Sequence, residues 1–175
     1  MIKNTMQTKH IITIFIICFF VNTSITFAQT SEQKAMKKLS FMVGDWKGSG
    51  TSYPKETSKP YDVMSTVHYD LDGELIVLRH RSKRGGKTVL ALHTLIYYNK
   101  EDGYYYYNAF RKNGARPFKC KVNDGKLICE INGNYRLTFQ RTQKGKFNEF
   151  GQRLVNGKWV KNFEDILHPA TGVKF

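Results

Sequence analysis

A β-hairpin can be read directly from FKCKVNDGKLICEI, residues 118–131. Asp124-Gly125 supplies the positive φ angles that a two-residue hairpin loop needs. With that loop, nearly all the apolar residues of both strands fall on one face, whereas a three-residue loop mixes apolar with charged residues. A slip of one residue is costly when one face is buried, so the two-residue loop is favoured. The predicted pairs on the apolar face are Val122 with Leu127, Cys120 with Cys129, and Phe118 with Ile131.

This register places Cys120 directly opposite Cys129 at a non-hydrogen-bonded position. The two Cα atoms of such a pair are about 4.5 Å apart, a distance that suits a disulfide. We therefore predict a disulfide between Cys120 and Cys129. The alternative is a pair of buried free thiols that pack as small hydrophobic side chains.

Turn signals recur at similar spacing on both sides of this hairpin, and the runs between them are rich in Val, Ile, Thr, Tyr and Phe, which is typical of strands. Sequential tight turns predict an all-β fold, a ten-stranded up-and-down antiparallel β-barrel, because closure removes both exposed sheet edges. The alternative is a sandwich of two sheets. The predicted strands are 45–53, 61–70, 74–82, 88–98, 104–111, 116–122, 126–131, 135–142, 147–155 and 158–167.

A short helix is predicted ahead of the strands, over about 31–43. Thr30 and Gln33 fit a capping box, apolar residues then recur at helical spacing, and Gly44 ends the run. The barrel itself is predicted over about 45–167. Residues 29–175 are thus expected to form a single domain.

The first 28 residues differ in composition from the rest of the chain. A basic start with Lys3 and Lys9 is followed by an apolar run eleven residues long, 11–21, and by the small residue Ala28 before Gln29. Eleven helical residues span about 17 Å, too short for a bilayer core of about 30 Å. Residues 1–28 are therefore predicted to be a secretory signal peptide, and the protein to be exported to the periplasm or the medium.

Removing this segment lowers the formal net charge from +14 to +12 and leaves two of the three cysteines. An even cysteine count in an exported chain permits a disulfide. Hydrophobic and charged contents of 41% and 24% are ordinary for a globular protein and exclude a disordered chain.

Two histidines are predicted to point into the barrel. If Gly85-Gly86 forms a two-residue loop and the more apolar residues of the two preceding strands face inward, His80 and His93 share the inner wall as diagonal neighbours roughly 7–8 Å apart. The opposite parity would place His68 and Arg79 inside instead.

Three tyrosines, Tyr97, Tyr105 and Tyr107, complete this predicted wall. Asn113-Gly114 as a two-residue loop places Tyr107 opposite Cys120, on the apolar face of the first hairpin. Together with the two histidines, these tyrosines form the polar group that we expect to orient a ligand.

Two further residues are predicted to point inward on the last two strands. With Lys144-Gly145 as a two-residue loop, Gln152 points inward, and Asn156-Gly157 as the next loop places Lys161 opposite it. An inward lysine must pair, reach water or meet a ligand. Gln152 and Lys161 are therefore candidates for contact with an anionic head group.

The entry into the first strand, GDWKGSG at residues 44–50, resembles the opening of lipocalin-like proteins of the calycin group. Its spacing Gly-x-Trp-x-Gly-x-Gly is most similar to nitrobindins and to a related family of exported bacterial lipocalin-like domains of unassigned function. The resemblance implies a barrel in which Gly44 and Trp46 are structural and the Trp plugs one end. Nitrobindins hold a haem through a late His, but no matching motif surrounds His168, so no cofactor is expected.

These observations favour a non-enzymatic protein that binds a small apolar or amphipathic molecule inside the barrel. The alternative is an interaction protein of the cell envelope that uses its basic surface. A nitrobindin-like haem protein is the third and least favoured hypothesis. The chain has no His-Glu-x-x-His, no Gly-x-Ser-x-Gly and no phosphate-binding loop, so neither an enzyme nor a metal site is expected, and no nucleic-acid motif is present.

Overall fold

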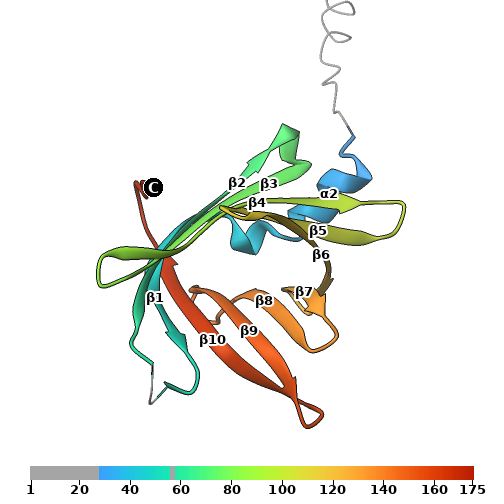
Figure 1. Ribbon diagram of the computed structural model, residues 1–175. Coiled ribbons are helices and arrows are strands. Elements are labelled where there is room, and N and C mark those ends of the chain that lie inside the picture. The colour runs from blue at the N-terminus through green and yellow to red at the C-terminus, as the bar shows by residue number, and fades with distance from the viewer. Residues whose placement is uncertain (1–27, 56–57) are drawn as a thin grey trace, which may run out of the picture.

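The computed structural model describes residues 28–55 and 58–175, so the predicted signal peptide lies outside the described residues except for Ala28. Ten strands form one closed antiparallel barrel in which β1 pairs with both β2 and β10, as Figure 1 shows. The predicted ten-stranded barrel is confirmed, and the two-sheet sandwich is excluded. Within the described residues, no helix combines the length and apolar character that crossing a bilayer requires.

The strands match the predicted ranges closely, because turn residues in the sequence indicate where the strands begin and end. Asp124 and Asn156 both have a φ of 49°, as their places in tight hairpin loops require. The bounds are β1 Gly44–Ser52, β2 Tyr61–Asp70, β3 Leu75–Arg84, β4 Lys87–Asn99, β5 Tyr104–Arg111, β6 Gly114–Asn123, β7 Lys126–Asn132, β8 Tyr135–Arg141, β9 Phe147–Val155 and β10 Lys158–Pro169; a 3-10 turn, η3 (Leu71–Gly73), joins β2 to β3.

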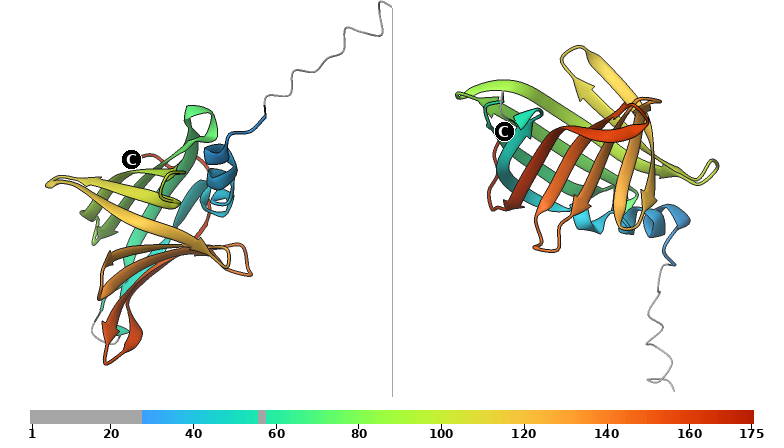
Figure 2. Two further views of the ribbon diagram at one scale, coloured as in Figure 1. Left: turned by 90° about the vertical axis from the view of Figure 1, so that its right-hand side faces the viewer. Right: turned by 90° about the horizontal axis from the view of Figure 1, so that it is seen from below.

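The helical segment lies across one end of the barrel, as Figure 2 shows. The capping box is present: the Gln33 amide donates to Thr30 Oγ1 at 3.1 Å, and the Thr30 amide donates to Gln33 Oε1 at 2.9 Å. The α-helix is shorter than predicted, since α2 spans Ser31–Lys37 and a separate 3-10 turn, η1, spans Ser40–Met42. The break between the two segments still leaves Ala35, Met36, Leu39 and Met42 buried.

This end of the barrel is packed solid. Trp46 is 1% exposed, and its indole N–H donates to the Met42 carbonyl oxygen at 2.9 Å. Its ring packs on Phe147 with 5.4 Å between centroids. The Tyr105 hydroxyl donates to the Ala35 carbonyl oxygen at 2.8 Å and so links β5 to α2. The helical segment thus closes the barrel with apolar side chains.

The opposite end has no such cover. Near that end, several residues face the barrel interior, as do their partners on the neighbouring strands. These residues are only partly buried. The barrel is therefore closed at the helix end and accessible to solvent at the other. These partly buried inner-wall residues are Leu92, Phe118, Tyr135, Leu137 and Phe163.

The hairpin of β6 and β7 has the predicted register, with Cys120 paired with Cys129 and Val122 with Leu127. The disulfide is present, with Cα atoms 4.0 Å apart. On the neighbouring β5 the register differs from the prediction by two residues, because Lys112 and Asn113, not Asn113 and Gly114, form the loop. A shift of two residues leaves the facing unchanged.

Removal of the disulfide is expected to be tolerated. It closes a short loop, with a sequence separation of 9, so the Cys120→Ser/Cys129→Ser variant should lose no more than about 2–3 kcal/mol of unfolding free energy. Urea denaturation of the oxidised protein and the double variant measures the difference. A variant that no longer folds at 25 °C would contradict this expectation.

Candidate ligand site inside the barrel

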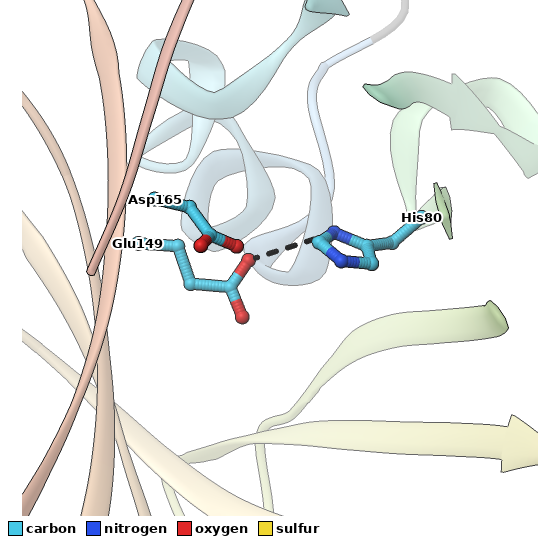
Figure 3. Close-up of side chains that lie close together, drawn as sticks. All are labelled: His80, Glu149 and Asp165. Carbon is cyan, nitrogen blue, oxygen red and sulfur yellow. Dashed lines mark ion pairs between the residues drawn. The ribbon is translucent and has the colours of Figure 1, made fainter. Parts of the chain in front are cut away.

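Three acid–base side chains meet inside the barrel: His80 on β3, Glu149 on β9 and Asp165 on β10. We call them the interior triad. Their exposures are 3%, 6% and 2%, and one ligand atom from each lies within 4.8 Å of the others. Figure 3 shows His80 projecting from one wall toward Glu149 and Asp165, which project together from the other.

His80 is held in place by two serine hydroxyls. Ser82 Oγ lies 2.8 Å from Nε2, and Ser65 Oγ lies 3.2 Å from Nδ1. The same Nδ1 lies 3.9 Å from Glu149 Oε2. Burial lowers the pKa of His80 to about 4, so the imidazole is neutral at pH 7.

The two carboxyl groups are paired residues on neighbouring strands. The Tyr61 hydroxyl donates to Asp165 Oδ1 at 2.8 Å, whereas Glu149 accepts no hydrogen bond from any described residue. Burial raises the pKa of Asp165 to about 6. Burial, and then the negative charge of Asp165, raise the pKa of Glu149 well above its usual range.

A glycine makes room for this arrangement. A Cβ on Gly50 would overlap the Tyr61 ring and Asp165 Oδ1, so only glycine lets the hydrogen bond between these two side chains pass across β1. Gly151 on β9 also leaves room for side chains, because a Cβ there would overlap the Tyr135 hydroxyl and the Phe163 ring. The last glycine of the Gly-x-Trp-x-Gly-x-Gly spacing thus shapes the polar layer.

Apolar rings lie on both sides of the triad. Toward the closed end, Tyr107, Phe139 and Phe147 form a continuous stack, with centroid distances of 5.4 Å and 6.3 Å. Toward the open end, Phe118 packs on Tyr107 at 6.4 Å and is partly exposed. The triad is therefore a polar layer between aromatic rings in a largely apolar interior.

Three of the predicted inner-wall residues do point inward. His80 belongs to the triad, Tyr107 lies in the ring stack beside it, and Tyr105 lies deeper, against α2. The parity with His68 and Arg79 inside is excluded: His68 is exposed and pairs with Asp45 at 3.0 Å.

The inward placement of His93 and Tyr97 was wrong. A bulge between Ser82 and Lys83 leaves Val89 unpaired, so His93 faces Arg79 and points outward. One inserted residue reverses the facing of the rest of the strand. His93 lines a surface groove of about 780 Å³, and Tyr97 stacks on Tyr106 outside the barrel at 5.4 Å.

The inward placement of Gln152 and Lys161 was also wrong. Thr142 and Lys146 pair across the turn, so the loop has three residues where two were predicted, and β9 shifts by one. Gln152 Oε1 accepts a hydrogen bond from Arg136 on the outer face at 2.9 Å. Lys161 still pairs with Gln152 as predicted, and its ammonium contacts Glu164 at 2.7 Å.

The same shift turns Glu149 inward. The bulge between Lys161 and Phe163 offsets the shift on β10, so Asp165 keeps the inward facing that an inward Lys161 would have implied. Sequence reasoning missed both acids. The available signal was Gly145, whose φ of 72° fits the last position of a three-residue loop as well as a two-residue one.

No protein-family model and no curated protein matches the chain. The crystal structure of Rv2717c from M. tuberculosis is similar, with a TM-score of 0.54 and 13% sequence identity, over 78% of this chain and 97% of that one. The likeness supports the antiparallel barrel fold alone and carries no family assignment.

Proposed function

We propose that the protein binds a small amphipathic molecule inside the barrel. The observation that carries this proposal is the interior triad, a group of buried acid–base side chains below the open end of a largely apolar interior. Ligand pockets combine an apolar wall with a few converging polar groups in this way. The polar head of the ligand would lie at the triad and its apolar part against Phe118, Leu137 and Leu92.

We further propose a binding protein rather than an enzyme, acting after export. The disulfide fits an oxidising compartment, and the N-terminal segment has the composition of a signal peptide. The basic envelope-surface hypothesis is weaker, because its lysines are spread along the chain.

Two measurements test the interior site. Solvent extraction of the purified protein followed by mass spectrometry should release a small molecule in a stoichiometric amount. After extraction, the neutral fluorescent probe N-phenyl-1-naphthylamine should bind with enhanced emission and be displaced by that molecule.

A matched pair of variants locates the binding. Leu92→Trp places a larger ring on the inner wall and should weaken probe binding at least about tenfold. Leu95→Trp, on the outer face of the same strand, should leave it unchanged. An empty protein that binds no probe, or equal effects of the two variants, would overturn the proposal.

A further inference from the structure

We propose that His80, Glu149 and Asp165 bind one divalent transition-metal ion, such as Zn²⁺, between β3, β9 and β10. One imidazole and two carboxylates are a donor set that suits Zn²⁺ or Mn²⁺ better than Ca²⁺ or Mg²⁺. This inference does not depend on the proposed function, because the metal alone can be measured.

The spacing of the donor atoms fits a single ion. Zn²⁺ binds nitrogen and oxygen at about 2.0–2.2 Å, so two donors on one ion lie at most about 4 Å apart. The donor atoms of the interior triad lie within 4.8 Å of one another, and His80 Nδ1 is already 3.9 Å from Glu149 Oε2. Side-chain movements of about 1 Å complete the site.

Glu149 is the observation that points to a missing partner. Its side chain is 8% exposed, accepts no hydrogen bond from the described residues and is aimed into the triad, as Figure 3 shows. No lysine or arginine among the residues described forms an ion pair with Glu149 or Asp165. A carboxylate this deeply buried, with only an imidazole 3.9 Å away to face it, is costly, and a cation at this point offsets that cost.

The surrounding side chains are arranged as supports of metal ligands usually are. When His80 Nε2–H donates to Ser82 Oγ, the Nδ1 lone pair accepts from Ser65 Oγ at 3.2 Å, and a bound metal ion would take the place of that hydrogen bond. Tyr61 holds one oxygen of Asp165 and leaves the other free to coordinate. Such outer hydrogen bonds fix the tautomer and orientation of ligating residues. Three protein ligands also leave a coordination position open for water or a bound molecule.

Isothermal titration calorimetry of chelator-treated protein with ZnCl₂, repeated with MnCl₂, tests the inference. We expect one site per chain and a higher unfolding temperature with the metal. Glu149→Gln and Asp165→Asn should each weaken zinc binding at least about tenfold. Glu164→Gln, a matched control on the outer face of β10, should not.

Surface histidines are the competing explanation for any zinc that binds. His93→Ala should leave the stoichiometry at one, and His80→Ala should abolish the site. Metal-free far-UV circular dichroism establishes that each variant is folded. Absence of binding to the chelator-treated wild type, or binding that survives both carboxamide variants, would overturn the inference.

Discussion

Replacing Trp46 by alanine is expected to lower the free energy of unfolding by about 3–5 kcal/mol. The side chain is 1% exposed, packs on Phe147 and is covered on its other side by Arg141, whose guanidinium carbon lies 4.7 Å from the ring centroid. Alanine leaves a cavity where the helical segment meets the barrel and a Met42 carbonyl oxygen without its donor. Guanidinium-chloride denaturation followed by far-UV circular dichroism measures the loss.

Two variants separate the contributions to this effect. Trp46→Phe retains a ring and loses the hydrogen bond, so a loss of about 1–2 kcal/mol is expected. Trp159→Ala, on the outer face of β10 beside Arg136, should cost less than about 1 kcal/mol. Equal losses for the two alanine variants would show that Trp46 does not have the closing role assigned to it.

Asp165→Asn is expected to raise stability at neutral pH in the metal-free protein. The pKa of Asp165 is about 6 in the folded state against 3.8 for an ordinary aspartate, because burial disfavours the charged form. A difference of about two pH units corresponds to roughly 3 kcal/mol. Asparagine has a similar shape and can still accept the hydrogen bond from Tyr61.

The sign of the pH dependence follows from proton linkage. Below about pH 3 the carboxyl group is protonated in both states, so Asp165 contributes no penalty. As the pH rises to about 6, the unfolded chain releases its proton first and folding becomes less favourable, after which the penalty is constant. The variant should therefore match the wild type near pH 3.5 and exceed it above pH 6.5.

His80 has the opposite effect, since its lowered pKa makes folding less favourable as the pH falls from about 6.5 to 4. This effect is common to wild type and variant and cancels in their difference. Urea denaturation in a chelator at pH 3.5, 5 and 7.5 measures the comparison, with Asp62→Asn at an exposed position of β2 as control. A variant less stable than the wild type at pH 7.5 would contradict the expectation.

A gain in stability on removal of Asp165, together with a loss of zinc binding, would mark the triad as functional rather than structural. Natural sites often retain groups that cost stability because the groups are needed for binding. If both carboxamide variants instead destabilise the protein, the triad serves the fold.

The strands and turns could be predicted almost completely because their signals are local. Asp124-Gly125 selects a hairpin loop, the alternation of Cys120 and Val122 with lysines selects the buried face, and both are present in the structure. The disulfide followed from the same few residues. Each of these predictions depends on one hairpin only.

The candidate site could be predicted only in part. Whether a side chain points into or out of the barrel depends on every bulge and loop length that precedes it along the chain. One unpaired residue at Val89 and one extra loop residue before β9 reversed His93 and Gln152 while leaving the strand ranges correct. No local pattern distinguishes these shifts, since the resulting strands bury a similar number of apolar side chains.

The amino-acid sequence by itself determined the ten strands, their antiparallel order and the disulfide, because period-two alternation and turn chemistry act between neighbours along the chain. Closure of the barrel brought His80 from β3 against Glu149 and Asp165 from β9 and β10, on the opposite wall. The proximity of these three side chains depends on all the bulges and loop lengths around the barrel together. The tertiary structure therefore decides which residues share the interior, and the candidate site is formed by those residues.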